Sequence, residues 1–361
     1  MAEATFVFPK GFLWGTATAS HQVEGRNTNN NWHQWEEDGH IIDDHKCGLA
    51  CDWWGGRWRE DFDRAAEDGQ NAHRLSIEWS RVQPSPDRWD EDALDYYRQM
   101  IRGLHERGMT PMVTLHHFTD PLWLVETGGW ENEQTVQHFQ TYVEKVVTAL
   151  KEYVTYWCTI NEPNVYATLG YVMGDFPPGK QDLGSTYQVM TNLVKGHAAA
   201  YHTIHKNQPE AEVGLVVNYR GMVPYRPWFP LDRLVAGLQS RTYNDFFPRA
   251  VTTGELRFPF KRQTLPEAKG TQDFFGINYY SQELVAFSPF ATQELFSKRF
   301  FDPEDEISET GFIANHPTGL FKALEWGRQF GVPIIITENG VEDSKDTLRP
   351  RYLAEHLHQV W

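Results

Sequence analysis

The sequence predicts an α/β protein whose parallel strands form a (β/α)8 TIM barrel. Apolar, β-branched runs alternate with amphipathic helical stretches, as is typical of a parallel sheet covered on both faces. Each apolar run ends in polar side chains, which would meet at the C-terminal face of a barrel. No G-x-G-x-x-G or Walker sequence follows any strand, which disfavours an open doubly wound sheet.

Seven βα units are expected in order along the chain. The strands are predicted from the runs FLWGTATA (12–19), AHRLSIEW (72–79), TPMVTLHH (110–117), YVTYWCTIN (153–161), VGLVVN (213–218), DFFGINYY (273–280) and VPIIITE (332–338). The helices that follow them are predicted near 58–70, 91–107, 131–150, 185–208, 229–246 and 317–330, with a last one from about 349. No Pro/Gly/Ser-rich linker interrupts this pattern, so residues 1–361 are predicted to form a single domain.

The eighth βα unit is not visible in this sequence. The chain stops at Trp361, inside the helix predicted after the seventh strand. A barrel that lacks one strand leaves two unpaired edges, so self-association or pairing with a complementing C-terminal fragment is expected. Three explanations stay open: the sequence is part of a longer chain, another chain supplies the unit, or the barrel closes differently.

Composition excludes several classes of protein. The 33 Lys and Arg residues against 49 Asp and Glu leave a net charge of −16, which argues against a basic nucleic-acid surface. No run approaches the roughly 18 apolar residues of a membrane helix. The N-terminal residues show no secretory signal, so a cytoplasmic location is expected.

The cysteines predict neither a disulfide framework nor a metal site. Cys47, Cys51 and Cys158 are the only three in the chain, an odd and sparse set. Cys47 and Cys51, with His45 and Asp52 nearby, suggest a metal loop. No second ligand pair follows at zinc-site spacing, so no metal is expected.

Two glutamates stand at opposed strand ends. Glu162 follows the fourth strand in the sequence TINEP, and Glu338 follows the seventh in ITENG. Cleavage of a glycosidic bond uses such a pair, one carboxyl to protonate the departing oxygen and one to attack the anomeric carbon or activate water. The two must differ in pKa. Arg74 and Tyr280 are expected to stabilise the Glu338 carboxylate, which makes Glu338 the nucleophile and Glu162 the acid.

Five ordered motifs make a family resemblance visible. They are FLWGTATASHQVEG near the start, RLSIEWSR at 74–81, TINEP, DFFGINYYS at 273–281 and ITENG. Together they resemble glycoside hydrolase family 1 over almost the whole chain. The resemblance implies a (β/α)8 barrel that acts as a retaining β-glycosidase, usually a β-glucosidase or β-galactosidase. It also implies a small-molecule β-glycoside substrate and no cofactor or metal.

The resemblance implies roles for further residues. Asn161 is expected to contact the sugar 2-hydroxyl, whose hydrogen bond strengthens in the transition state. Gln22 and His117 are expected on the 3- and 4-hydroxyl side of the ring. Asn278 and Tyr280 are expected to contact substrate and, with Arg74, to support the nucleophile.

The sequence also departs from the family pattern. Phe118 follows His117 where the family usually has Trp, and a phenyl ring cannot donate the indole N–H hydrogen bond. Thr310, Gly311 and Phe312 stand where the family typically places an aglycone-side Trp after Met-Gly. The family segment that contacts the 4- and 6-hydroxyls would lie in the missing unit, so gluco, galacto or fuco preference is not predicted.

Three other functions stay open. An endo-acting cellulase or mannanase on a related barrel would use the same glutamate pair in an open cleft, but the family motifs argue against it. An incomplete barrel could bind sugars without turning them over. A metal hydrolase built on His116 and His117 would need more carboxylate and His ligands at other strand ends. His116 is therefore expected to be structural.

Overall fold

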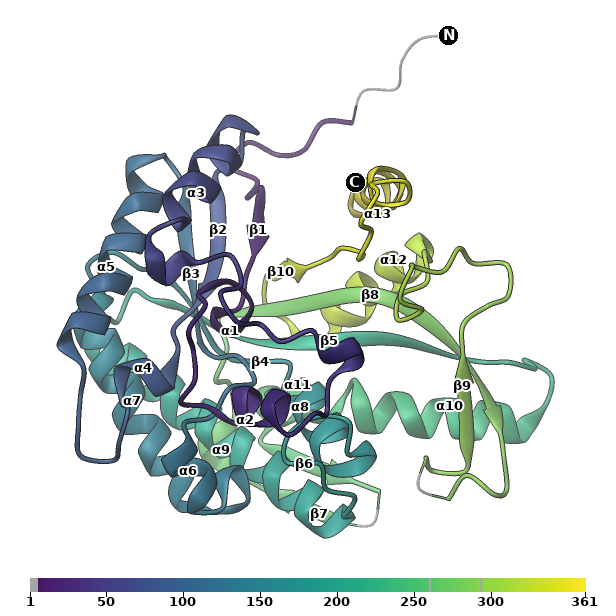
Figure 1. Ribbon diagram of the computed structural model, residues 1–361. Helices are drawn as coiled ribbons and strands as arrows, with labels where there is room; N and C mark the ends of the chain where they lie inside the picture. The colour runs from purple at the N-terminus through teal and green to yellow at the C-terminus, as the bar shows by residue number, and fades with distance from the viewer. Residues whose placement is uncertain (1–5, 260, 293) are drawn as a thin grey trace, which may run out of the picture.

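The computed structural model describes residues 6–259, 261–292 and 294–361 and contains a curled main sheet (Figure 1) and a separate two-stranded antiparallel sheet. Its seven main strands pair in the order β1-β2-β3-β4-β5-β8-β10, and every neighbouring pair is parallel. The strands are β1 (Gly15–Ala17), β2 (Ala72–Ser76), β3 (Thr110–His116), β4 (Tyr156–Asn161), β5 (Glu212–Pro224), β8 (Phe274–Phe287) and β10 (Ile334–Glu338). The predicted α/β fold with seven strands in barrel order is confirmed.

The sheet stays open between its first and last strands. β10 pairs with β8 on one side, and no ladder joins β10 to β1 among the described residues. Figure 1 shows β1 and β10 at the two ends of the strand order, on either side of this opening. Gly15 and Thr16 of β1 are exposed, and Ile334, Ile335 and Ile336 of β10 are only half-buried. The backbone groups on both edges are therefore available for pairing.

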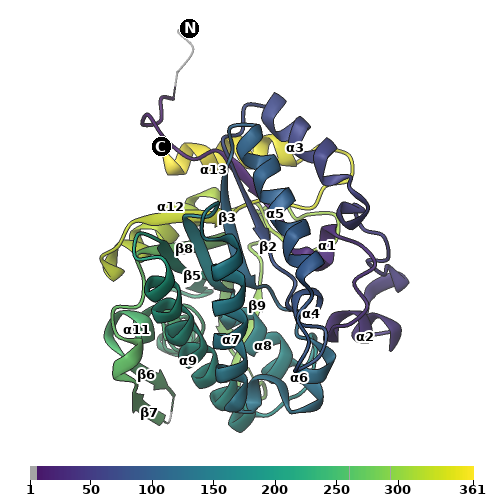
Figure 2. The same cartoon turned by 90° about the vertical axis from the view of Figure 1, so that its left-hand side faces the viewer.

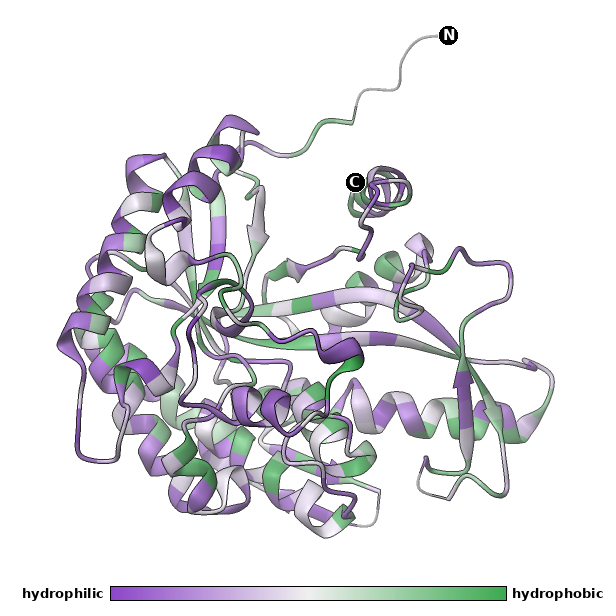
Figure 3. Ribbon diagram, viewed as in Figure 1, coloured by the Kyte–Doolittle hydropathy of each residue, from purple (hydrophilic) through white to green (hydrophobic). Residues whose placement is uncertain are grey.

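Helices cover the outer face of the sheet (Figure 2). The longer ones are α3 (Trp58–Glu67), α5 (Glu91–Glu106), α7 (Gln134–Leu150), α9 (Leu183–Asn207), α10 (Pro230–Tyr243), α12 (Pro317–Gly327) and α13 (Arg349–Val360). Each carries hydrophobic and hydrophilic residues in alternation (Figure 3). In α5, Leu94, Tyr97, Ile101 and Leu104 form the buried stripe at helical spacing, and Asp90 caps the first turn by accepting from the backbone N–H of Ala93.

Shorter elements line the loops above and beside the sheet. They are α1 (Ser20–Val23), α2 (Asn31–Glu37), α4 (Trp79–Val82), α6 (Leu122–Glu126), α8 (Pro163–Thr168), α11 (Phe246–Thr253), β6 (Glu255–Phe258), β7 (Lys261–Thr264) and β9 (Ser297–Phe300).

Several expected boundaries differ from the structure. β5 and β8 run beyond the predicted ends at 218 and 280 and form a long ribbon, to which β9 adds an antiparallel strand. Arg220 and Gly221 interrupt the apolar run, so the extension of β5 resembles a loop in the sequence. The pairing of β5 with β8 shifts register between Tyr219 and Gly221. The helix predicted at 229–246 ends at Tyr243, because Asn244 turns its side chain to the backbone of Arg220 on β5.

The strands pack on both faces. Most of the core lies between sheet and helices and includes Val113, Trp157 and Phe275. A smaller cluster contains Met112, Cys158, Val216 and Phe274. Arg74 pairs in register with Met112, so its side chain points to the same face as that cluster. In the described part of the chain, no helix has the length and apolar character needed to cross a bilayer.

Helix α12 approaches β8 at a glycine. A Cβ on Gly319 would lie 1.9 Å from the Tyr279 hydroxyl, which donates to the His316 carbonyl at 2.7 Å. We expect Gly319→Ala to lower the free energy of unfolding by about 1 to 3 kcal/mol through overpacking. Gly237→Ala on α10 is the matched control, because its Cβ would meet nothing closer than Arg241 at 3.9 Å. It should raise stability by about 0.5 to 1 kcal/mol. Urea unfolding measures both, and equal losses would contradict the close approach.

Candidate active site

Glu338 ends β10 and is held by two donors. Arg74 Nη1 on β2 donates to its Oε1 at 2.6 Å, and the Tyr280 hydroxyl on β8 donates to its Oε2. The Arg74 side chain is only 4% exposed, whereas that of Glu338 is 18% exposed. The ion pair is therefore shielded from water on the arginine side, while the carboxylate keeps an open face.

Glu162 follows β4 and is the residue before helix α8. Its Oε1 accepts two hydrogen bonds of 2.8 Å, from Asn218 Nδ2 on β5 and Asn278 Nδ2 on β8. Its backbone is left-handed, with φ 46° and ψ 55°, and Pro163 begins the helix. This turn brings the side chain back to the strand ends, where no cation hydrogen-bonds to its carboxyl among the described residues.

Asn161 joins the surroundings of the two carboxyls. Its Oδ1 accepts from Arg74 Nη2 at 2.5 Å and from Asn278 Nδ2 at 3.3 Å. Arg74 thus reaches Glu338 with one nitrogen and Asn161 with another. The structure therefore brings both glutamates into one hydrogen-bonded cluster built from the ends of several strands.

The two carboxyls differ in pKa. Burial, reinforced by the negative charge of Glu338, raises the pKa of Glu162 from 4.5 to about 7. Burial would also raise the pKa of Glu338, but the Arg74 charge and hydrogen bonds from Arg74 and Tyr280 outweigh it and lower that pKa. One carboxyl is thus biased toward its protonated form and the other toward its ionised form.

Of the two residues expected on the 3- and 4-hydroxyl side, His117 contacts the catalytic cluster and Gln22 does not. His117 Nε2 faces Asn161 Nδ2 at 3.1 Å, and burial lowers the pKa of His117 to about 3. The neutral ring accepts at Nε2 and so carries its proton on Nδ1, a buried atom with no partner among the described residues. Gln22 is exposed on α1, and its side chain makes no hydrogen bond within the described part of the chain. The structure therefore joins His117 to the cluster but not Gln22.

Asn218 and Glu78 lie beside the site although the sequence does not predict them as site residues. Asn218 donates a hydrogen bond to Glu162, and the feature of the sequence that points to it is its place as a polar residue at a strand end. The Glu78 carboxylate accepts hydrogen bonds of 2.7–2.9 Å from Ser20, Asn27, Ser80 and Thr119. This carboxylate ties the segment around α1 to the loop after β3.

His116 lies in the protein interior. Its Nε2 faces Asp120 Oδ1 at 3.0 Å, and the Trp130 ring packs edge-on against it. Among the described residues, neither His116 nor His117 belongs to a cluster of three metal-ligating side chains. This arrangement gives no support to the metal-hydrolase alternative.

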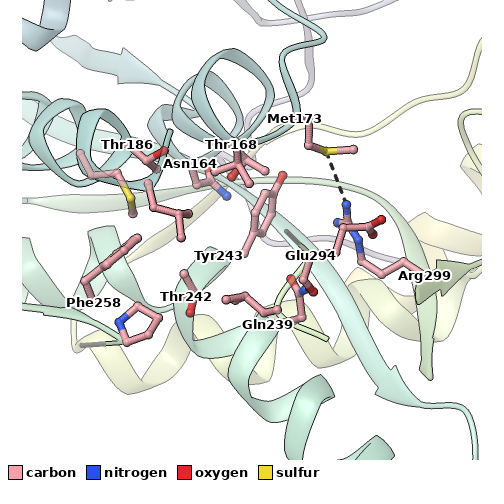
Figure 4. A pocket seen from close by; sticks show the side chains of 15 residues that line it. Asn164, Thr168, Met173, Thr186, Gln239, Thr242, Tyr243, Phe258, Glu294 and Arg299 are labelled. Atoms are coloured by element: carbon pink, nitrogen blue, oxygen red, sulfur yellow. Dashed lines mark hydrogen bonds between the residues drawn. The ribbon is translucent and has the colours of Figure 1, made fainter. Parts of the chain in front are cut away.

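An apolar pocket lies beside the cluster (Figure 4). Tyr243 lines it and donates from its hydroxyl to Asn218 Oδ1 at 3.2 Å. Asn164, also in the lining, donates to the Asn218 carbonyl at 2.7 Å. On the far side, the Arg299 guanidinium faces the Met173 sulfur at 3.6 Å. The pocket is thus linked to Glu162 through Asn218.

The opposite pKa shifts predict opposite effects on stability. Because folding raises the pKa of Glu162, the native state binds more protons than the unfolded state between pH 4.5 and about 7, and stability falls as pH rises through this window. Glu162→Gln should therefore stabilise the protein at pH 8, by on the order of 1 to 3 kcal/mol, but little at pH 5. Thermal melting at both pH values measures this.

Glu338→Gln is the matched comparison. Because folding lowers the pKa of Glu338, the ionised form stabilises the fold above the unfolded-state pKa, and this contribution disappears as pH falls. The substitution leaves Arg74 buried without its anion and should destabilise the protein at pH 7 by on the order of 3 kcal/mol. Loss of stability in both variants at pH 8 would argue against the assigned charge states.

Comparisons with known proteins identify the family of this chain. The family model "Glycosyl hydrolase family 1" matches residues 4–361. The chain is 31% identical to β-glucosidase A of Thermotoga maritima, over 98% of this chain and 85% of that protein. Among solved structures, a β-glycosidase from Pyrococcus horikoshii superposes with a TM-score of 0.90 at 36% identity, covering 98% of this chain and 81% of that one. The Thermotoga maritima β-glucosidase in complex with deoxynojirimycin superposes with a TM-score of 0.90 at 30% identity, covering 98% and 85%. The chain belongs to glycosyl hydrolase family 1 and is a retaining glycoside hydrolase.

Proposed function

We propose that this protein hydrolyses terminal, non-reducing β-glycosyl residues of small glycosides, with Glu338 as nucleophile and Glu162 as acid/base. The observation that carries the proposal is the opposed charge bias of two glutamates within one hydrogen-bonded cluster. A β-glucoside is the preferred substrate, since the relatives of known activity include β-glucosidases from Thermotoga maritima and Acetivibrio thermocellus.

In the first step, the ionised Glu338 attacks the anomeric carbon while the bond to the leaving oxygen breaks. Glu162 gives its proton to that oxygen, so the aglycone departs as a neutral alcohol. The loss of that proton leaves Glu162 ionised, and the bond between Glu338 and the sugar removes the neighbouring negative charge. Because that charge helps to raise the pKa of Glu162, its removal lowers the pKa at the stage when Glu162 must act as a base.

In the second step, Glu162 takes a proton from water as the water oxygen attacks the anomeric carbon. The bond to Glu338 breaks, the sugar leaves with its original configuration, and both carboxyls return to their starting states. Arg74 and Tyr280 again receive the released carboxylate. The pair thus completes one turnover with protons and charges balanced.

The sugar ring would be positioned by the polar side chains around the pair. His117 stays proposed for the 3- and 4-hydroxyl side of the ring, and Asn161, whose Nδ2 donates to His117 Nε2, is the proposed donor for the 2-hydroxyl. Asn278 and Tyr280 border the two carboxyls. Gln22 would join them only if a bound sugar reaches the exposed α1. Phe312, on the proposed aglycone side, is 60% exposed.

We also propose that residues 1–361 form a single domain and that the protein is cytoplasmic. Self-association, or pairing with a complementing C-terminal fragment, is supported by the lack of a ladder between β1 and β10 among the described residues. Family membership favours turnover over the alternative of a sugar-binding protein.

The nucleophile is tested by chemical rescue. Glu338→Ala should reduce hydrolysis of p-nitrophenyl β-glucoside to background, because no covalent intermediate can form. Added azide should restore part of the rate and give the α-glycosyl azide, since it attacks from the face that Glu338 occupied. NMR of the product identifies the anomer, and a β-azide would contradict the role of Glu338.

The acid is tested by leaving-group dependence. Glu162→Ala should slow substrates with poor leaving groups, such as cellobiose, by about 10² to 10⁴-fold more than activated aryl glycosides, which depart without a proton. In the wild type, kcat/KM should fall on the alkaline side with an apparent pKa of about 7, and Glu162→Ala should flatten this limb. Equal rate losses on both substrate types would rule out Glu162 as the acid.

A further inference from the structure

Three side chains that commonly bind metals converge outside the catalytic cluster. His21 lies on α1, Glu36 on α2, and Cys47 in the loop that follows, and their ligand atoms all lie within 4.8 Å of one another. His21 is 8% exposed and Glu36 is 4% exposed, whereas Cys47 is half-buried. The three residues line one cavity. The site is therefore built from three separate segments and retains an opening to solvent.

The chemistry of this donor set suits Zn²⁺. Imidazole nitrogen, carboxylate oxygen and thiolate sulfur are its usual ligands, at about 2.0 to 2.3 Å. In a tetrahedral site, such bond lengths place ligand atoms about 3.3 to 3.8 Å from one another. His21 Nε2 already lies 2.9 Å from Glu36 Oε1. The cluster therefore needs adjustments of about 1 Å or less to surround an ion.

The charges around the cavity also fit a divalent cation. One carboxylate and one thiolate would neutralise Zn²⁺, and the two nearby cationic side chains have anionic partners of their own. Lys46 pairs with Glu37 at 2.9 Å, and Arg26 pairs with Asp52 at 3.0 Å. Neither cation is thus held by the carboxylate of Glu36.

We propose that His21 Nε2, Glu36 and Cys47 Sγ bind one Zn²⁺ ion, with water as the fourth ligand. Binding releases the thiol proton of Cys47 to solvent, and the proton on His21 Nε2 moves to Nδ1, so that Nε2 can ligate the ion. Asn30 Nδ2 lies 3.4 Å from His21 Nδ1, so this long contact is given up when the ring proton moves to Nδ1. The bound ion fastens α1 to α2 and to the loop around Cys47, beside Gln22.

Without the ion, the same residues form a hydrogen-bonded group. Burial and the neighbouring Glu36 raise the pKa of the Cys47 thiol to about 12, so the metal-free protein holds a protonated cysteine. The Glu36 carboxylate also accepts from the Cys47 backbone N–H at 3.2 Å. A metal-free protein should therefore stay folded, which permits a direct binding test.

The test is a titration of the full, chelator-treated chain with Co²⁺, which reports thiolate ligation by a charge-transfer absorption band. The wild type should bind one equivalent with this band, and Zn²⁺ should displace the ion. Cys47→Ser should abolish the band and weaken binding at least about tenfold, since even loss of a residue that only supports a ligand has that effect. Cys51→Ser, at the exposed cysteine outside the cluster, is the matched control and should behave as the wild type.

A second variant, Glu36→Gln, tests the site through its carboxylate and leaves the Cys47 thiol in place. Glu36→Gln should weaken Zn²⁺ binding. Zn²⁺ should raise the melting temperature of the wild type and of Cys51→Ser, which keep the three ligands. It should not raise that of Cys47→Ser or Glu36→Gln, which each lack one. The proposal is wrong if the wild type shows no saturable 1:1 binding, or if the band persists in Cys47→Ser. Loss of binding in Cys51→Ser would also overturn it, because the ligands would then lie in the loop of Cys47 and Cys51.

Discussion

Arg74 is the group on which the arrangement of the strand ends depends. Its Nε donates to Thr114 on β3 at 2.9 Å, and its two terminal nitrogens reach Asn161 on β4 and Glu338 on β10. A guanidinium this deeply buried needs an anion and satisfied donors to be tolerated. The side chain therefore holds four strands, from β2 to β10 across the sheet, in one relative position. The same contacts that satisfy the cation place the candidate nucleophile.

Both catalytic glutamates are buried, but the charges of the groups around them differ. Burial opposes ionisation of both, so the difference comes from their neighbours. Glu338 accepts hydrogen bonds from a cation and a phenol, whereas the donors to Glu162 among the described residues are two amides. Amides donate hydrogen bonds to a carboxyl oxygen in either protonation state, which suits a group that must alternate between acid and base. A cation would bind the ionised form too firmly for that role.

The strand order could be predicted from the sequence because strands buried on both faces are visible as continuous apolar runs. Glu162, Glu338 and Arg74 were named because each ends or lies within such a run. The extension of β5 past Asn218 is not predicted, since Arg220 and Gly221 interrupt the apolar run. Asn218 and Glu78 were missed as neighbours of the site because their partners lie far away in the chain. The exposure of Gln22 depends on how α1 packs, which no local pattern reports.

The left-handed backbone of Glu162 has an evolutionary consequence. A non-glycine residue with φ 46° is strained by about 1 to 2 kcal/mol, and a following proline further restricts the backbone. Burial of a carboxyl that no cation hydrogen-bonds among the described residues lowers the stability of the fold further. Glycine would relieve the strain but remove the proton donor, so selection for stability and selection for catalysis oppose each other at this position. In a lineage released from catalysis, the glutamate should be among the first residues lost, and glycine or asparagine there would mark a descendant that keeps the barrel but no longer turns over substrate.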